Sequence, residues 1–367
     1  MTPPPEGERH RGPDPCTILA AVAQDTVRWG ILSTAGINGS LIPGLLAAEG
    51  CELVGIASRS RERAQAEAAR WGCRAHTGYA ALLADPAIDA VYIPLPNDQH
   101  AEWTVRALEA GKHVLCEKPL ALSVAEVDGI AAASARAGRL VLEAFMYRYA
   151  PRWRRAVGLV AAGAIGEPRI VRVGFAFRVP PDPRNIRFIP EAGGGIIWDM
   201  GCYAASMARG MLGAEPTEVF AAAHRSEGRA TETTVTGVMR FPRQADAPFW
   251  VSFDFGNPFA QVEVIGTEGW MLLPGTGFRR EARTKLLLHR GGGEIYADGV
   301  EPVEEVCPSV DPYRLEVEHL AAAIRDRSPL SHSLADSRAN TAVLEAMHAG
   351  VADAHPHPVT GGTSRRA

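Results

Sequence analysis

The sequence predicts two domains: a doubly wound α/β domain followed by an α+β domain with a large, mostly antiparallel open sheet. Three observations support this prediction. The chain has 367 residues, too many for one ordinary hydrophobic core. Short apolar runs alternate with helical stretches up to about residue 147. After residue 149, longer β-rich runs follow one another with few helices between them.

The first domain is expected over residues 25–148. Its expected strands are residues 27–33, 52–58, 90–93, 113–116 and 140–142, and its expected helices are 41–49, 62–71, 79–84, 100–110 and 123–137. Gly72 and Gly138 stand where helices end, and Ser123 with Glu126 forms a capping box. Strands and helices in this order predict parallel pairing through right-handed crossovers, with ligands at the carboxyl ends of the strands.

The second domain is expected over residues 149–352. Its expected strands are residues 170–178, 217–224, 231–241, 249–255, 260–265 and 285–289, and its expected helices are 151–162, 204–212, 313–326 and 335–349. We expect residues 1–24 to be a disordered extension and residues 353–367 a flexible tail. Residues 16–23 imitate the apolar part of a signal peptide, but two nearby prolines, Pro13 and Pro15, make that alternative weaker.

Composition excludes several classes of function. The chain has 38 basic and 42 acidic residues, a net charge of −4, so no basic field for nucleic acid is expected. No apolar run approaches the ~20 residues that a membrane helix needs. Six cysteines are widely spaced with no C-x-x-C pair, which predicts free thiols, no metal site and a cytoplasmic protein.

A loop of small residues follows the first expected strand. Ser33, Ala35 and Asn38 occupy the positions that are glycine in the G-x-G-x-x-G pattern of dinucleotide-binding domains. Small residues allow the backbone to turn sharply and approach a pyrophosphate at a helix N-terminus. The cofactor-binding residues predicted in this loop are Ser33, Thr34, Ala35, Gly36, Ile37 and Asn38. The alternative is an ordinary tight turn between a strand and a helix.

The end of the second expected strand favours NADP over NAD. Enzymes that prefer NAD commonly place a carboxylate there for the ribose hydroxyls, whereas this chain has Ser58 followed by Arg59. A guanidinium can bind a 2′-phosphate, which a carboxylate would repel. We therefore expect Ser58, Arg59 and Arg63 to contact NADP. The alternative is a solvated basic start of a helix.

Two further motifs lie at the carboxyl ends of later strands. The first is a proline-stiffened loop, from which Leu95, Pro96, Asn97 and His100 are expected to contact the cofactor. The second is Glu117-Lys118-Pro119, in which Glu117 and Lys118 are expected beside the nicotinamide. A lysine there can hydrogen-bond a substrate oxygen and lower the pKa of a neighbouring phenol. A Lys–Pro bond can also be cis. The alternative for an isolated Glu-Lys-Pro is a surface turn.

Asp199 and Tyr203 form the last motif. They are four residues apart, so they share one face if the helix that follows begins early enough. A phenol can donate a proton to a developing alkoxide or accept one from an alcohol, although its pKa near ~10 must fall for work as a base. Lys118 is expected to lower it. The alternative is a half-buried core tyrosine whose hydroxyl is already satisfied.

Together these motifs resemble the glucose–fructose oxidoreductase/inositol dehydrogenase (Gfo/Idh/MocA) family. The resemblance covers roughly residues 27–350. It is carried by D-A-V-Y-I-P-L-P-N-x-x-H at 89–100, A-G-K-H-V-L-C-E-K-P at 110–119, E-A-F-M-Y-R at 143–148, G-G-G-I-I-W-D-M-G-C-Y at 193–203 and V-I-G-T-E-G at 264–269. It implies an N-terminal Rossmann domain and a C-terminal open sheet that often forms the oligomer interface.

The resemblance also implies hydride transfer between NAD(P) and a carbinol or carbonyl carbon of a sugar, cyclitol or related diol. The catalytic Lys and Asp of the family match Lys118 and Asp199. Many members have His where this chain has Tyr203, and this difference is similar to the subgroup of dimeric dihydrodiol dehydrogenase and certain ketosugar reductases. The loop at 33–38 departs from the glycine pattern of the family.

The predicted function is that of an NADP-dependent oxidoreductase, with no nucleic-acid or membrane partner and with a homodimer or homotetramer formed through the second sheet. Tyr203 is the expected acid–base, Lys118 tunes it and holds the substrate oxygen, and Asp199 binds substrate or orients Lys118. Weaker candidates for substrate contacts are Arg148, Arg178, Asn185 and Arg187. The alternative is a non-catalytic dinucleotide sensor, which would not need both Lys118 and Tyr203.

Overall fold

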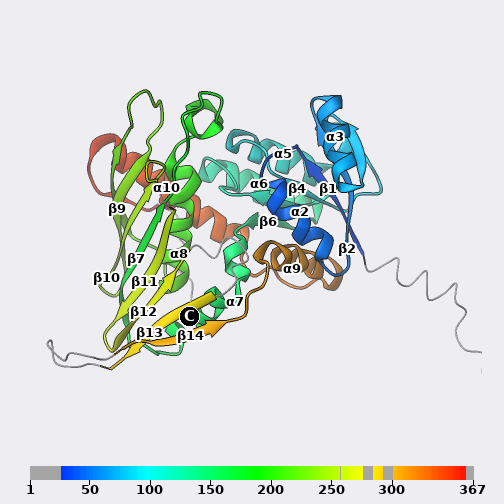
Figure 1. The fold of residues 1–367 in the computed structure, drawn as a ribbon. Coiled ribbons are helices and arrows are strands. Elements are labelled where there is room, and N and C mark those ends of the chain that lie inside the picture. Colours follow the sequence, from blue (N-terminus) through cyan, green and yellow to red (C-terminus); the bar gives the residue numbers. More distant parts are fainter. Residues whose placement is uncertain (1–25, 257, 276–283, 292–300, 361–367) are drawn as a thin grey trace, which may run out of the picture.

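The computed structural model describes residues 26–256, 258–275, 284–291 and 301–360. The chain forms two sheets, each with its own helices (Figure 1). The first sheet has six parallel strands in the order β3-β2-β1-β4-β5-β6. Its strands are β1 (Val27–Leu32), β2 (Cys51–Ser58), β3 (Arg74–Thr77), β4 (Ala90–Ile93), β5 (His113–Glu117) and β6 (Val141–Ala144). The strand order reverses beside β1, as in a doubly wound sheet.

The helices of this domain are α2 (Asn38–Ala47), α3 (Arg61–Trp71), α4 (Tyr79–Leu83), α5 (Asn97–Glu109) and α6 (Val124–Ala137). Their ends follow the capping signals. The Ser123 side chain accepts a hydrogen bond from the Glu126 backbone, and Gly72 and Gly138 adopt the left-handed conformation after α3 and α6. The central strands are mostly buried, and Trp29 and Tyr92 are completely buried.

The second sheet has nine described strands in the order β14-β13-β12-β11-β7-β10-β9-β8-β15. They are β7 (Pro168–Ala176), β8 (Glu218–His224), β9 (Thr234–Phe241), β10 (Ala245–Ser252), β11 (Phe259–Gly266), β12 (Gly269–Pro274), β13 (Thr284–Arg290), β14 (Val303–Cys307) and β15 (His357–Pro358). All described pairs are antiparallel except β7 with β10. The predicted fold class is therefore confirmed for both domains.

The remaining helical elements are η1 (Met146–Tyr149), α7 (Pro151–Ala161), η2 (Ile186–Phe188), η3 (Pro190–Ala192), η4 (Ile197–Gly201), α8 (Cys202–Leu212), α9 (Pro312–Asp326) and α10 (Leu334–Asp353). α8 and α10 pack on one face of the second sheet (Figure 1). α9 instead returns to the first domain and packs on α2. Gly44 permits this, because a Cβ there would lie 2.7 Å from the backbone nitrogen of Arg314.

Four strands were not predicted from the sequence. β3 lies at the edge of its sheet and has a polar, mostly exposed sequence, so it lacks an apolar pattern. β12, β14 and β15 were missed as well. Because β15 pairs with β8, the expectation of a flexible tail from residue 353 is wrong for residues 357–358. The extension at 1–24 and residues 361–367 lie outside the described residues. None of the described helices is long and apolar enough to cross a membrane.

Candidate active site

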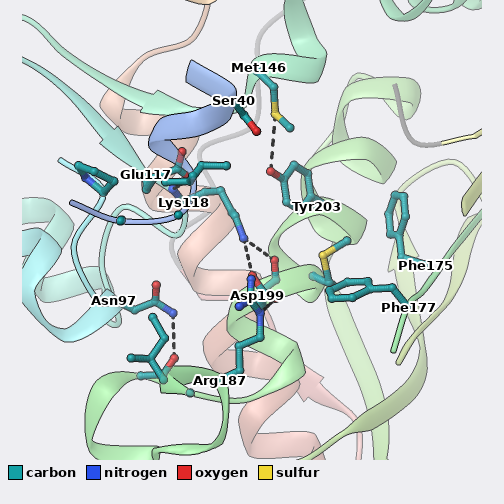
Figure 2. A pocket seen from close by; sticks show the side chains of 18 of the residues that line it. Ser40, Asn97, Glu117, Lys118, Met146, Phe175, Phe177, Arg187, Asp199 and Tyr203 are labelled. Atoms are coloured by element: carbon teal, nitrogen blue, oxygen red, sulfur yellow. Dashed lines mark hydrogen bonds and ion pairs between the residues drawn. The ribbon is translucent and has the colours of Figure 1, made fainter. Parts of the chain in front are cut away.

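A cavity of about 1010 Å³ lies between the carboxyl ends of the first sheet and the second domain. The loop after β1, the ends of β4 and β5, the start of α8 and the end of β7 all contribute to its walls. Figure 2 shows Lys118, Asp199 and Tyr203 grouped in it, with Asn97 on one side and Phe175 and Phe177 on the other. Lys118 from the first domain thus lies in one cavity with Asp199 and Tyr203 from the second, and all three are predicted to act in catalysis.

The loop after β1 is held by side chains rather than by glycines. Ser33, at the first glycine position of the pattern, has a φ of 135°, a value that L-residues rarely adopt. Its hydroxyl donates to the carbonyl of Pro94 at 3.1 Å and accepts from the Ala35 backbone at 3.2 Å. The amide of Asn38 donates to the Ser33 carbonyl at 2.9 Å. These bonds keep the tight turn without a glycine at positions 33, 35 and 38.

Three loop residues predicted to bind cofactor, Ala35, Gly36 and Ile37, line the cavity, whereas Ser33, Thr34 and Asn38 do not. Gly36 is exposed, and the place of its missing Cβ has no neighbouring heavy atom within 4 Å. The loop precedes the N-terminus of α2, so it leaves open space where helix N–H groups attract an anion.

Arg59 and Arg63 lie exposed at the start of α3. Leu32 pairs with Ala57, so this helix start is next to the small-residue loop at the same edge of the sheet. Ser58 is buried, and its hydroxyl accepts a hydrogen bond from the Ser60 backbone. Arg59 and Arg63 thus stand where an anionic group beside the loop would meet them, whereas Ser58 shapes the turn.

The proline-stiffened loop and the Glu-Lys-Pro motif are joined by His100. Its two ring nitrogens lie 2.8 Å from the Leu95 carbonyl and 2.7 Å from the Pro119 carbonyl. Asn97 donates to the Gly193 carbonyl of the second domain at 2.9 Å. Leu95, Asn97 and His100 line the cavity, and Pro96 precedes the first residue of α5 without lining it.

Three charged side chains form a row along the cavity. The Lys118 ammonium donates to the Asp199 carboxylate at 2.7 Å and to the Asp199 carbonyl at 2.8 Å. The Arg187 Nε donates to the second carboxylate oxygen at 2.7 Å (Figure 2). Burial opposes charge on both Lys118 and Asp199, but their attraction outweighs it: the pKa of Lys118 is raised and that of Asp199 is lowered. All three groups therefore stay charged at neutral pH. The Lys118–Pro119 bond is cis.

Glu117 lies in the cavity wall next to this row. Its carboxylate accepts a hydrogen bond from the Tyr92 hydroxyl at 2.5 Å. Burial raises the pKa of Glu117, although the neighbouring Lys118 ammonium opposes that shift. The hydrogen bond from Tyr92, a buried residue of β4, therefore holds the Glu117 carboxylate in position.

Asp199 lies in η4, and Tyr203 lies in α8, the helix that follows directly. η4 is a π-helical turn, a feature frequent at functional sites. The Tyr203 hydroxyl donates to the Met146 sulfur at 3.6 Å, a weak acceptor. The Lys118 nitrogen lies 5.0 Å from the centre of the Tyr203 ring. Lys118 and Tyr203 are therefore neighbours, and the Lys118 ammonium lies close to the Tyr203 ring.

The expectation that Lys118 lowers the pKa of Tyr203 is wrong for the protein alone. Burial, and secondly the nearby Glu117 carboxylate, raise the pKa of Tyr203 well above its ordinary value. The positive charge of Lys118 is already balanced by the Asp199 carboxylate in an ion pair. Tyr203 is therefore a protonated phenol over the whole neutral range, a state suited to donating a proton.

Of the four weaker candidates for substrate contact, Arg187 alone lines the cavity. Arg148 is engaged elsewhere: its guanidinium bonds the Asp336 carboxylate at 2.7 Å. Arg178 is exposed, and the side chain of Asn185 accepts from the Arg187 backbone at the start of η2. Arg148 and Asn185 thus support the structure around the site.

Several residues that line the cavity were not predicted from the sequence: Ser40, Met146, Phe175, Phe177, Ile186, Met200, Phe259 and Tyr313. The apolar ones match the ordinary core pattern of strands and helices, so no local signal separates them from core residues. Tyr313 comes from α9, which reaches the site through long-range packing on α2 and η1. Among the described residues there is no cluster of His, Cys, Asp and Glu that could hold a metal, and five described cysteines are free.

Comparisons with known proteins match both halves of the chain. Residues 27–145 match an oxidoreductase family with an NAD-binding Rossmann fold, and residues 153–272 match the GFO/IDH/MocA C-terminal domain. An uncharacterized oxidoreductase (ORF334) of Rhizobium meliloti is 40% identical over 88% of this chain and 96% of its own length. D-xylose 1-dehydrogenase (NADP(+)) 2 of Haloferax volcanii is 38% identical over 88% of this chain and 98% of its own.

A solved structure is also similar across both domains. It is a 3-ketoreductase, KijD10, from Actinomadura kijaniata in complex with NADP and TDP-benzene. The TM-score is 0.81 at 28% identity, over 89% of this chain and 98% of the other.

Proposed function

The chain belongs to the GFO/IDH/MocA family of oxidoreductases, and from this premise we propose that it transfers a hydride between NADP and a carbinol or carbonyl carbon of a sugar, cyclitol or related diol. The observation that carries the proposal is the grouping of Lys118, Asp199 and Tyr203 in one cavity beside the small-residue loop. The named activities of the relatives, a xylose dehydrogenase and a ketosugar reductase, point to the same substrate class.

The residues around the loop fit an NADP molecule. Ala35, Gly36 and Ile37 leave room for a pyrophosphate before α2, and Arg59 and Arg63 offer exposed guanidinium groups to a 2′-phosphate. Asn97 and Glu117 line the cavity farther along, toward Lys118. NADPH, when bound, supplies the hydride.

In the reductive direction, Lys118 would hold the substrate oxygen through an N–H that polarises the carbonyl. The carbonyl carbon receives the hydride, and the π electron pair moves onto oxygen. That oxygen takes the phenolic proton of Tyr203, which gives a carbinol and leaves a Tyr203 phenolate that regains its proton from solvent. Asp199 keeps the ammonium charged and aimed. Oxidation is the same sequence in reverse, with the Tyr203 phenolate as base.

The proposal is tested by NADPH oxidation and NADP+ reduction with a panel of ketosugars, aldoses, cyclitols and cyclic diols. We expect turnover with at least one class, faster with NADP than with NAD. Tight binding of NADP without turnover of any compound would instead support a dinucleotide sensor. Such a sensor has no use for the Lys118–Asp199 pair beside Tyr203, which is the reason we favour the enzyme.

Replacing Arg59 by alanine should weaken the binding of NADPH and leave the binding of NADH unchanged. A charge-assisted hydrogen bond contributes about 1.5–3 kcal/mol. We therefore expect the KM for NADPH to rise roughly 10–100-fold. Arg61→Ala is the matched control, since Arg61 is an exposed arginine in the same helix start. Equal losses with NADPH and NADH would contradict the 2′-phosphate contact.

The uncovered face of the second sheet supports a homodimer or homotetramer. Phe220 of β8 lies opposite Val238 of β9, and both are more than one-third exposed. We expect Phe220→Glu to raise the dissociation constant of the oligomer at least about tenfold, because it places a charge in an apolar contact. Light scattering after size exclusion measures it. The control is Leu46→Glu, which changes an exposed leucine of the first domain and should leave the dissociation constant unchanged. A wild-type monomer would refute the assembly.

A further inference from the structure

The turn that carries Lys118 is held from both sides by buried side chains. It consists of Lys118, Pro119 and Leu120, directly after β5. On one side, a ring nitrogen of His100 lies 2.7 Å from the Pro119 carbonyl. On the other side, the Glu143 carboxylate accepts a hydrogen bond from the Leu120 N–H at 3.0 Å. Glu143 thus bonds the backbone two residues after Lys118, although it does not line the cavity.

The fold fixes Glu143 at this place. Glu143 belongs to β6, pairs with Cys116 of β5 and is 2% exposed. Its carbonyl oxygen lies 3.0 Å from the Nε2 of His332, which comes from the segment before α10. Burial lowers the pKa of His332 to about 3, so that ring is neutral. The sheet and His332 therefore set the Glu143 carboxylate beside the turn that follows β5.

The surroundings of Glu143 offer little compensation for a charge. Burial raises its pKa to about 7, although the Ser337 hydroxyl and the Leu120 N–H oppose that rise. The Arg148 guanidinium also favours the charged form, but the Asp336 carboxylate already binds it at 2.7 Å. Burial raises the pKa values of both neighbouring cysteines, so they stay thiols. The polar and titratable groups that face Glu143 are Cys116 on β5, Cys202 on α8, Arg148 on η1, His332 before α10, and Asp336 and Ser337 on α10.

The charge of Glu143 decides how firmly it holds the turn. A hydrogen bond to an ionised acceptor is roughly twice as strong as one between neutral groups. We propose that Glu143 is a positioning residue, whose carboxylate holds the Leu120 N–H and thereby aims the Lys118 ammonium at the substrate oxygen. When Glu143 takes up a proton, this bond weakens and Lys118 is less precisely placed. The inference rests on the proposed hydride transfer, in which Lys118 holds that oxygen.

The pH dependence of carbonyl reduction by the full-length protein tests this role. For the wild type at saturating NADPH, we expect kcat/KM to rise about tenfold between about pH 5.5 and pH 8.5 as Glu143 loses its proton. The midpoint should lie near pH 7. Glu143→Gln keeps a carbonyl acceptor of the same length but removes the charge. Its kcat/KM should therefore stay close to the low-pH value of the wild type at every pH.

Two further variants accompany Glu143→Gln. Glu345→Gln is the matched control, because the Glu345 carboxylate also accepts a backbone N–H of this region, that of Val124 at 2.8 Å, and does not line the cavity. It should leave the pH profile of kcat/KM unchanged. Ser337→Ala keeps the Glu143 carboxylate and removes a hydroxyl that favours its charge, so it should move the midpoint to higher pH.

Thermal stability separates positioning of Lys118 from a merely structural role of Glu143. Since the pKa of Glu143 in the fold is above its ordinary value of 4.5, its ionisation destabilises the fold increasingly as the pH rises from about 4.5 to about 7. The Tm of Glu143→Gln relative to the wild type should therefore increase with pH, while its relative kcat/KM falls.

Two results would overturn the inference and leave hydride transfer intact. One is a Glu143→Gln protein with the same pH profile of kcat/KM as the wild type. The other is a Glu143→Gln protein whose Tm, relative to the wild type, falls together with its kcat/KM. Absence of turnover by the wild type with every compound, in both directions, refutes the proposed function itself and the inference with it.

Discussion

Replacing Tyr203 by phenylalanine is expected to lower kcat for carbonyl reduction by about 10²–10⁴-fold, the usual contribution of a general acid. The substitution removes the phenolic proton and keeps the ring. That ring lies 5.4 Å from Phe145 and 6.4 Å from Phe175, so the packing should persist. Stopped-flow oxidation of NADPH under saturating substrate measures the effect. The affinity for NADPH should stay within about twofold, because the change leaves the small-residue loop intact.

Tyr147→Phe is the matched control. Tyr147 is a buried tyrosine whose ring lies 5.9 Å from that of Tyr203, and its hydroxyl bonds Ser206 at 2.7 Å without lining the cavity. We expect its kcat to stay close to that of the wild type. A Tyr203→Phe enzyme with unchanged kcat would remove Tyr203 from the mechanism.

The pH profile follows from the raised pKa of Tyr203. Since the pKa lies well above the ordinary value of 10.0, the phenol is protonated throughout pH 6–9 in the protein alone. Reduction, which needs the protonated form, should therefore show no decline with rising pH in that range. Oxidation needs the phenolate and should accelerate as pH rises. A reduction rate that falls with a midpoint near neutral pH would contradict this assignment.

The parts of the site that were predictable from the sequence are those that follow a strand end or a helix start. Lys118 comes directly after β5, and Asp199 in η4 stands four residues before Tyr203 at the start of α8. In a parallel sheet, strand ends meet at one edge, so the position of Lys118 at the site edge could be predicted. Its contact with Asp199, 81 residues away, depends on how the second domain packs. The capping residues and most strands could be found for the same reason, because their signals are local.

The apolar residues that line the cavity could not be predicted as site residues, because no local sequence signal marks them. Phe175 belongs to a strand with the burial pattern of any core strand, and the packing of β7 on α8 places it at the cavity. Ser33 replaces the first glycine of the pattern, and its hydroxyl bond to the Pro94 carbonyl shows how the turn forms without glycine at that position. Arg148 looked like a cation for substrate, but its partner Asp336 is 188 residues away.

Replacing Lys118 by alanine is expected to lower kcat/KM by about 10²–10³-fold, the range seen when one donor to a developing oxyanion is removed. Asp199 would keep Arg187 as its second partner, so its carboxylate would remain paired and the fold should tolerate the change. Lys285→Ala is the control, since Lys285 forms an exposed ion pair with Glu304 away from the cavity. Steady-state kinetics at fixed, saturating NADPH measures both variants.

Chemical rescue separates a donor to substrate from a merely structural lysine. Alanine at position 118 leaves space beside Asp199 for a small ammonium ion, which the Asp199 carboxylate attracts. We expect ethylammonium to restore kcat/KM of Lys118→Ala at least about fivefold and to leave Lys285→Ala unchanged. The ion returns a charged N–H donor without rebuilding the covalent side chain. If kcat/KM falls but no amine restores it, and Tm falls in parallel, then Lys118 acts by holding η4 in place. In that case Tyr203 would assist the substrate oxygen without a hydrogen bond from Lys118.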